Sequence, residues 1–479
     1  MNTEKQGIVS GSFIHDIGKF MQRAELEKEY SEIKDNYNDF CPTPYSYLHA
    51  AHSAFFVEKF LPETLVSKEM KKYLYDACRH HLDACDKIFK IADRLSSGMD
   101  RTGSAEDGGN YKSTRLVSIF DSVEVLYKND VKPSWYYDLR KLAGDKELFP
   151  VRNEERNLVQ EYQQLWTDFE QELNNLGKVQ ISNFHVLFNE LFYLLQKYTW
   201  CIPSATNKLP DISLFDHLKT TSAIAACLYD VQQHGESDKG KEFLLFGLDL
   251  SGIQSFIFRI TSALGIGGIS RRLRGRSFYL IMLGEILARY AVNQLDLTIA
   301  NINFCGGGNI ELLLANTGKT DEFLKQFESD VNKWLLDKFS GQIAVAMDGL
   351  AISKSDLQNN FHEKKRELQE MIDLKKKRKF ETHFGFDSFL HKTPSSSLIT
   401  VCPSCNLTQI KKGQDICNDC KEHKKIGEEL PKTKALVFIL GSDVKPANNP
   451  VSVCFGKFGK IYLLSKPDTD ILNTDETGY

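Results

Sequence analysis

The sequence predicts a multidomain α+β protein, because two distinct hydrophobic patterns follow one another along the chain. Residues 8–98 carry apolar side chains at three- and four-residue steps, as at Val57, Phe60 and Leu61, which indicates an all-α domain. From residue 243 onward, short apolar runs alternate with helical patterns, which indicates strands packed against helices. At roughly 150 residues per domain, the 479 residues suffice for about three domains.

The all-α domain is expected at residues 1–98, followed by a linker and mainly helical region at 99–240. Residues 99–111 are polar and glycine-rich, which is typical of a surface loop. Helical patterns return at Glu155–Leu176 and Asn183–Tyr198.

Residues 241–355 are expected to form a ferredoxin-like domain. Apolar runs and helical patterns alternate here in the order strand, helix, hairpin, helix, strand. This order is shared by the palm domains of polymerases and cyclases. The strands are expected at Phe243–Leu250, Ile299–Cys305, Ile310–Ala315 and Gln342–Met347, the turn of the hairpin at Gly306–Asn309, and the helices at Ser277–Leu295 and Asp321–Lys338.

Two further regions follow the ferredoxin-like domain. Residues 356–433 contain a basic helix at Phe361–Phe380 and a cysteine-bearing segment at 402–423. Residues 434–479 carry short strand-like runs and are expected to be the start of another region.

The overall charge of the chain gives no support for nucleic-acid binding. Lysine and arginine number 60 and acidic residues 64, a net charge of −4, so any such binding needs local patches. The chain shows neither a signal-peptide core nor a run of the ~18 apolar residues that a membrane span needs. We therefore expect a cytoplasmic protein without a membrane partner.

Four of the eleven cysteines form two CxxC pairs, Cys402 with Cys405 and Cys417 with Cys420. Two intervening residues allow both thiolates of a pair to reach one tetrahedral ion. The pairs favour metal binding in a reducing compartment over a disulfide framework. We predict a structural zinc site; His423 could replace one cysteine, but four cysteines already fill the coordination sphere.

Histidine and aspartate are concentrated near the amino terminus. Imidazole and carboxylate are the ligands expected for a hydrolytic transition-metal centre, although any single histidine here could equally be a core or surface residue. Gly18 permits close helix packing, and Lys19 could meet a phosphate. The cluster consists of His15, Asp16, His49, His52, His80, His81 and Asp93.

The order HDIGK (15–19), HAAHSA (49–54), RHH (79–81) and ADRLSSGMDR (92–101) resembles the permuted HD domain of a CRISPR family, the large catalytic subunit of type III-A (Csm) effector complexes. The resemblance continues through residues 201–230, 249–260 and 270–280, the glycine hairpin and the CxxC pairs. It implies an HD nuclease domain that cleaves single-stranded DNA with a divalent transition metal (manganese, nickel or cobalt). By this match the metal ligands are His15, Asp16, His49, His80, His81 and Asp93.

His15 and Asp16 are the catalytic pair of that match. We choose Asp16 as a bridging ligand and Lys19 as a helper for transition-state charge. His52 is an alternative ligand outside this first choice. Two-metal activation of water for in-line attack on a phosphodiester is the expected chemistry.

The palm-like domain is expected to be non-catalytic. Its first strand carries Asp249, but the hairpin turn carries no carboxylate for a second metal. Ser251 and Gly252 follow the strand and open a helix, so with Asp249 they are candidate nucleotide-binding residues. In the resembled family the first palm is degenerate, and a second palm with a GGDD turn makes cyclic oligoadenylates from ATP. No GGDD occurs here, so we expect an amino-terminal portion that binds ATP weakly or not at all and lacks cyclase activity alone.

Four arginines, Arg271, Arg272, Arg274 and Arg276, lie close together among glycines. Such a run is commonly a solvated, salt-bridged face, but with glycines it also suits a loop around a phosphate backbone. We expect contact with guide or target RNA. The resemblance adds single-stranded DNA as substrate and other Csm subunits as partners.

Two alternatives to the nuclease hypothesis remain open. The chain could be a non-catalytic scaffold that binds RNA and partner subunits, or an HD-type nucleotide phosphohydrolase. The palm-like and cysteine-bearing segments favour the nuclease over a stand-alone nucleotidase.

Overall fold

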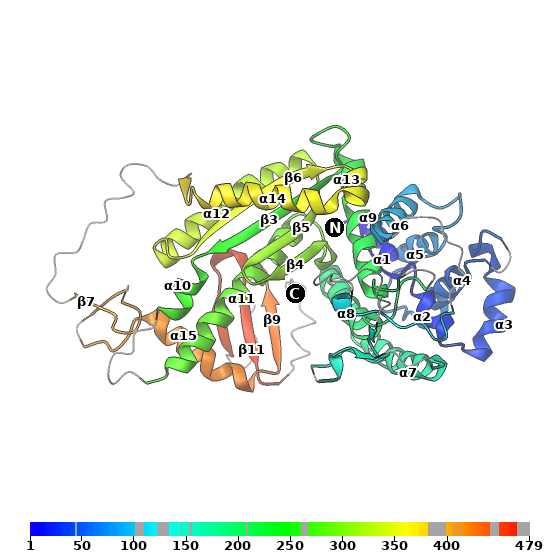
Figure 1. The fold of residues 1–479 in the computed structure, drawn as a ribbon, viewed down its shortest axis with the longest axis horizontal. Helices are drawn as coiled ribbons and strands as arrows, with labels where there is room; N and C mark the ends of the chain where they lie inside the picture. The colour runs from blue at the N-terminus through cyan, green and yellow to red at the C-terminus, as the bar shows by residue number, and fades with distance from the viewer. Residues whose placement is uncertain are drawn as a thin grey trace. The chain divides into compact units, whose positions relative to one another are not determined.

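The computed structural model divides into two compact units, shown in Figure 1. The helical unit comprises residues 1–233 and 353–360, and the sheet unit comprises residues 234–352 and 361–479. The finer division into five domains stays a prediction. The structure describes residues 1–43, 46–100, 110–121, 134–144, 146–152, 156–206, 209–259, 267–381, 399–406, 408–411, 413–440 and 450–466.

The helical unit consists mainly of ten helices in its described residues, and the first six form the all-α region predicted at 1–98. Most of the predicted loop at 99–111 lies outside the described residues. Two short strands, β1 (Trp135–Tyr136) and β2 (Val151–Arg152), pair antiparallel. The helices are α1 (Thr3–Ile14), α2 (Gly18–Arg23), α3 (Glu27–Asn36), α4 (Leu48–Phe55), α5 (Lys68–Cys78), α6 (Lys87–Asp100), α7 (Val159–Leu176), α8 (Phe184–Thr199), α9 (Leu214–His234) and α13 (Lys354–Asn359).

Helix α1 is the buried centre of this unit. Its two glycines, Gly7 and Gly11, lie directly against α5, where an added Cβ would come within about 3 Å of Tyr73. Helix α9 is joined to α1 by a hydrogen bond from Ser222 Oγ to the Val9 carbonyl, 2.9 Å long. Because α1 is held between these helices, its carboxyl end is fixed inside the unit.

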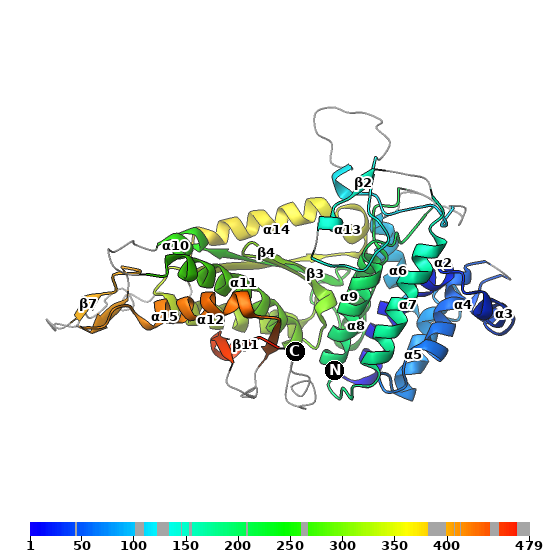
Figure 2. The ribbon, with the colours of Figure 1, turned by 90° about the horizontal axis from the view of Figure 1, so that it is seen from below.

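The sheet unit contains a four-stranded antiparallel sheet in the order β4-β5-β3-β6. With the chain order β3, α11, β4, β5, α12, β6, this arrangement confirms the predicted ferredoxin-like topology. Figure 2 shows α14 on one side of the sheet and α11 and α12 on the other. The bounds are β3 (Phe243–Ser251), α10 (Ile253–Phe258), α11 (Ile269–Gln294), β4 (Ile302–Gly306), β5 (Asn309–Ala315), α12 (Gly318–Phe339), β6 (Ala344–Ile352) and α14 (Phe361–Lys376).

The hairpin between β4 and β5 turns on two residues, Gly307 and Gly308. Both have positive φ, +60° and +91°. A two-residue hairpin that needs positive φ at both positions strongly favours glycine. The sequence therefore correctly predicted a tight turn.

One expectation about the sheet unit was wrong. The arginine-rich segment is not a loop, because α11 begins at Ile269 and runs through all four arginines. Gly275 lies inside the helix at a close crossing with α15, where an added Cβ would be 1.9 Å from the His423 carbonyl oxygen. Close packing, rather than a turn, explains this glycine.

The remaining elements of the sheet unit are short. A β-ribbon with helix α15 carries the four cysteines, and a separate antiparallel sheet has the order β10-β11-β9. Within the described residues, no helix is both long and apolar enough to span a membrane. These elements are β7 (Ile399–Val401), β8 (Gln409–Lys411), α15 (Asn418–Glu429), β9 (Ala435–Ile439), β10 (Val451–Cys454) and β11 (Lys460–Leu464).

Candidate metal centre

The six predicted ligands of the HD-type site come together inside the helical unit. They lie at the end of α1, on α4, directly after α5 and on α6. Two overlapping groups of possible metal-binding side chains form, and within each group the ligand atoms all lie within 4.8 Å of one another. The first group is His49, His80 and His81, and the second is His15, Asp16, His80 and Asp93. His80 belongs to both groups, so the donors suit two adjacent ions.

Backbone carbonyls set the orientation of two of these histidines. His15 Nδ1 lies 2.8 Å from the Ser12 oxygen, and His80 Nδ1 lies 2.9 Å from the Ala77 oxygen. A carbonyl can only accept, so each Nδ1 carries the proton and donates it. In the neutral ring, Nε2 then keeps its electron pair for a metal, and it is directed toward the centre.

The carboxylate of Asp16 lies in the middle of the cluster. Its Oδ1 is 3.4 Å from His49 Nε2 and 3.6 Å from His80 Nε2. Its Oδ2 is 3.6 Å from His15 Nε2 and 2.5 Å from Lys19 Nζ. A carboxylate with both oxygens facing imidazoles has the placement that a bridging ligand needs.

Several buried atoms at this centre lack hydrogen bonds. His15 Nε2, Asp16 Oδ1, His80 Nε2 and His217 Nε2 are buried and make none in the structure. An unsatisfied buried polar atom costs about 1–3 kcal/mol, so four together would be a considerable cost. Coordination of a cation would satisfy those of His15, Asp16 and His80, which belong to the ligand groups. The residues present therefore fit a metal site.

The charges of the centre are arranged for a cation. Burial alone would raise the pKa of Asp16, but Lys19 and the nearby histidines hold it well below its usual range. Burial would likewise raise the pKa of Asp93, while the neighbouring imidazoles of His15 and His217 hold it well below its usual range. Burial lowers the pKa of His80 to about 4 and that of His81 to about 3. The carboxylates are thus ionised and these two imidazoles neutral at physiological pH.

Gly18 explains how the His-Asp turn is held in place. An added Cβ there would lie 2.0 Å from the His49 carbonyl oxygen. The Gly18 amide donates a 2.9 Å hydrogen bond to Ser53 Oγ. The turn after α1 and helix α4, which carries His49, are therefore in backbone contact.

A cavity of about 260 Å³ opens onto this centre. Lys19 lines it together with Asp16, His49, His81 and Asp93. The predicted helper lysine is thus beside the ligands. His52 belongs to neither ligand group; its Nδ1 lies 2.8 Å from the Leu48 carbonyl.

His217 on α9 is a member of this centre that sequence reasoning missed. Its Nε2 lies 3.4 Å from Asp16 Oδ2 and 3.3 Å from Asp93 Oδ1. Ser96 Oγ is 3.1 Å from its Nδ1. The available signal was a histidine within the family-like stretch 201–230, but it lies more than a hundred residues beyond the other ligands.

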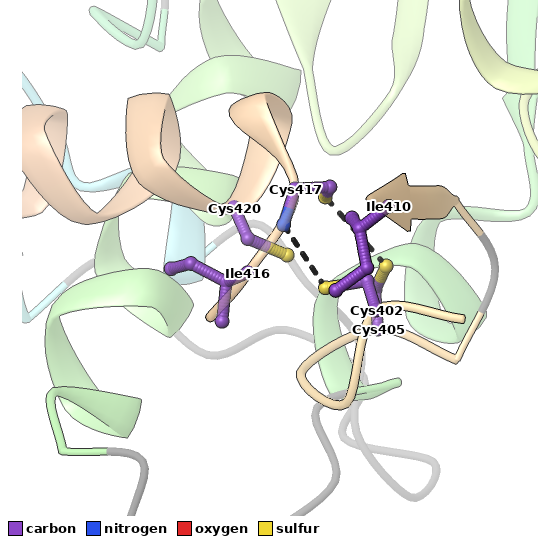
Figure 3. Packing of buried hydrophobic residues seen from close by; sticks show 6 residues of the cluster. All are labelled: Cys402, Cys405, Ile410, Ile416, Cys417 and Cys420. Atoms are coloured by element: carbon purple, nitrogen blue, oxygen red, sulfur yellow. Dashed lines mark hydrogen bonds between the residues drawn. The ribbon is translucent and has the colours of Figure 1, made fainter. Parts of the chain in front are cut away.

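The four predicted cysteines also meet, in the sheet unit (Figure 3). Cys402, Cys405, Cys417 and Cys420 are buried, and their sulfurs lie within 4.8 Å of one another. The Cys417 amide donates a 3.2 Å hydrogen bond to Cys402 Sγ. This geometry suits a tetrahedral ion with four thiolate ligands. His423 is not in the group; its ring packs edge-on against Phe256 and Tyr279.

The sheet face that carries Asp249 is neutralised by lysines of α14. Asp249 Oδ2 is 2.9 Å from Lys376 Nζ, and Glu311 on β5 pairs with Lys365 at the same distance. Ser251 ends β3, and Gly252 precedes the six-residue helix α10 with φ +93°. Nucleotide binding by these residues stays a prediction.

The four arginines on α11 differ in exposure. Arg272 and Arg276 are buried and donate to carbonyls of the same unit, Arg272 to Gly267 and Arg276 to Phe256. Arg271 and Arg274 are exposed, and Arg271 pairs with Glu428. RNA contact stays a prediction. Of the four arginines, Arg271 and Arg274 have the exposed side chains that such a contact needs.

Comparison with known proteins adds independent findings. Residues 242–392 match the family described as Csm1 subunit domain B. The chain is 34% identical to the CRISPR system single-strand-specific deoxyribonuclease Cas10/Csm1 (subtype III-A) of Methanocaldococcus jannaschii, over 78% of this chain and 50% of that protein. It is 30% identical to the protein of the same name from Enterococcus italicus, over 74% and 48%.

A solved structure shares the fold. The Csm1–Csm4 subcomplex of the type III-A CRISPR-Csm interference complex aligns with a TM-score of 0.63 at 23% identity, over 97% of this chain and 56% of that one. The helical region and the antiparallel sheets of this chain therefore share the fold of that structure. The chain is a relative of Cas10/Csm1, as its motifs indicated, and spans about half the length of the relatives it matches.

Proposed function

We propose that this chain is a metal-dependent nuclease for single-stranded DNA within an RNA-guided type III-A complex. The observation that carries the proposal is the set of buried ligand atoms of His15, Asp16 and His80 that make no hydrogen bonds. The names of the relatives supply the substrate class. In the hydrolysis, water adds to phosphorus and one ester P–O bond breaks.

Six residues would hold one or two metal ions. Manganese, nickel or cobalt suits a site of imidazoles and carboxylates, and when bound such an ion supplies Lewis-acid activation of phosphate and water. Asp16 would bridge, and Lys19 at the cavity wall would offset charge developing on the phosphate. The ligands are His15, Asp16, His49, His80, His81 and Asp93.

The test is cleavage of a labelled single-stranded oligonucleotide by the purified chain with manganese, nickel or cobalt. Asp16→Asn and His15→Ala should abolish cleavage while leaving the thermal unfolding temperature nearly unchanged, because apolar packing, not the ligands, holds the helices. His185→Ala, on α8 outside the cluster, is the matched control. Undiminished cleavage by Asp16→Asn would refute the assignment.

The same assay separates the rival functions. A stand-alone nucleotide phosphohydrolase would hydrolyse deoxynucleoside triphosphates in preference to the oligonucleotide. A scaffold would bind RNA and partner subunits without processing either substrate.

Further assignments belong to the same proposal. The four cysteines would hold structural zinc, and Arg271 and Arg274 would contact guide or target RNA. Other Csm subunits are proposed partners, since the relatives' structures are of Csm1–Csm4 assemblies, and the cytoplasm is the proposed location.

The hairpin at 306–309 offers no carboxylate, so this palm would not itself convert ATP to cyclic oligoadenylates, and Asp249, Ser251 and Gly252 would at most bind nucleotide.

A further inference from the structure

A second cavity, of about 490 Å³, lies beside the metal cavity in the helical unit. The two cavities share three lining residues, Gln22, Leu48 and Tyr111. Cavities of roughly 300–1,000 Å³ hold small organic groups. A ligand whose charged part lies at the metal centre can therefore extend past Tyr111 into this second space.

Part of the wall of the second cavity is apolar. Met21, Leu26 and Ile33, from α2, the turn after it and α3, contribute aliphatic surface. This aliphatic surface suits an uncharged group better than a phosphate, whose charge would lose its hydration against it.

Most of the rest of the lining is polar. The Tyr111 hydroxyl donates to Glu25 at 3.0 Å, and Lys112 pairs with the same carboxylate at 2.6 Å. These contacts fix the Tyr111 ring and leave the local charge near balance. Gln22 and His52 add an amide and an imidazole to the lining. One aromatic ring, aliphatic walls and a few hydrogen-bonding groups match the faces and edge of a nucleobase.

We propose that this cavity binds an unpaired base of single-stranded DNA next to the phosphate at the metal centre. The proposal rests on the nuclease function proposed above. A base inside a duplex is stacked and paired, and only an unpaired or extruded base can enter such a pocket. The cavity would thus contribute to the choice of single strands over duplexes.

The experiment compares two oligodeoxynucleotides of equal length with manganese, one of normal thymidines and one whose sugars carry no bases. The wild-type chain should cleave both, with a KM about tenfold higher for the base-free strand, since stacking on an aromatic ring contributes about this factor or more.

Two variants test the pocket. Tyr111→Ala removes the ring, and Leu26→Trp fills the space; both should raise KM for the thymidine strand and abolish the difference between substrates. Tyr111→Phe keeps the ring and should retain the wild-type difference. Tyr193→Ala, an exposed tyrosine of α8, is the control and should behave as wild type.

The outcomes separate the two proposals. If wild type cleaves neither strand, the proposed nuclease function fails. Equal KM for both strands in wild type overturns the base pocket while the nuclease function stands. Full discrimination in Tyr111→Ala and Leu26→Trp also overturns it, because the base would then bind elsewhere.

Discussion

His217 gives the metal centre a ligand candidate from α9, a helix remote in sequence from the others. Its Nε2 is buried, lacks a hydrogen bond and lies within 3.4 Å of both aspartates. A residue that orients or supplements metal ligands typically changes metal affinity or activity by about 10–100-fold.

We therefore predict that His217→Ala lowers manganese affinity and DNA cleavage by about 10–100-fold. Titration calorimetry with manganese measures the first effect, and initial cleavage rates measure the second. The His185→Ala control should retain both. Wild-type manganese affinity in His217→Ala would exclude the residue from the centre.

The buried histidines also predict how the stability of the metal-free protein depends on pH. The pKa of His80 falls from 6.5 in the unfolded chain to about 4 in the folded one, chiefly through burial. Between these values the unfolded chain binds a proton that the folded chain does not, so stability is complete above 6.5 and is lost as the pH falls toward 4. His81, with a pKa of about 3, acts in the same direction. The raised pKa of His217, where the two nearby aspartates outweigh burial, opposes it.

With a chelator present, the unfolding temperature of the helical unit should thus fall across this window. His80→Gln should reduce the fall by several degrees, because the difference between 6.5 and about 4 corresponds to about 3 kcal/mol, and 1 kcal/mol shifts the unfolding temperature of a domain of this size by about 2–4 °C. His185→Gln should not reduce it. An unfolding temperature that rises on acidification would contradict the sign of the argument.

At the scale of secondary structure, the crossing of α11 and α15 depends on two glycines. A Cβ on Gly275 would lie 1.9 Å from the His423 oxygen, and one on Gly427 would lie 1.8 Å from the Arg271 oxygen. Arg274 also donates to the Gly427 carbonyl at 3.0 Å. Backbone therefore meets backbone at this crossing, which brings the cysteine-bearing helix onto the palm-like domain.

We predict that Gly275→Ala destabilises the sheet unit by about 1–3 kcal/mol, because the helices must separate. Gly284→Ala in the same helix is the matched control, since its Cβ would meet only Cys305 Sγ, at an ordinary 3.5 Å. That variant should gain up to about 1 kcal/mol from helix propensity. Denaturant unfolding of both variants gives the measurement, and equal stabilities would contradict the close crossing.

These elements also show what the sequence could predict. Strand β3 and the hairpin were found because an apolar run and a glycine turn are local signals. The start of α11 was missed because arginines and glycines suggest a loop. Here Gly275 lies inside the helix and allows close packing against α15. Strand β6 continues past its predicted end at Met347 to Ile352. Asp348 and Gly349 have low strand propensity, but their pairing with β3 keeps them in the sheet.

The same contrast applies to the metal centre. Its six predicted ligands occur in short motifs within residues 15–93, and all six converge. His217 lies on a helix that packs back onto α1 from more than a hundred residues away. That proximity is created by tertiary packing, which a single sequence does not display.

Across the whole molecule, the two candidate metal sites lie in different compact units. The His/Asp centre is built entirely from residues 15–217 of the helical unit, and the four cysteines belong to the sheet unit. Each unit has its own buried apolar side chains. The two sites should therefore be separable by mutation.

We predict that Cys402→Ser combined with Cys405→Ser removes one zinc per chain and destabilises the sheet unit, because structural zinc contributes folding free energy directly. Single-strand DNA cleavage should remain within about twofold of wild type, as expected for independent sites that share no residues. Cys454→Ser, an exposed cysteine outside the cluster, should keep the zinc and the stability. Elemental analysis, thermal unfolding and the cleavage assay on the same preparations give the three measurements. Loss of cleavage with the zinc, in a helical unit that still unfolds at its normal temperature, would show that the two centres are coupled.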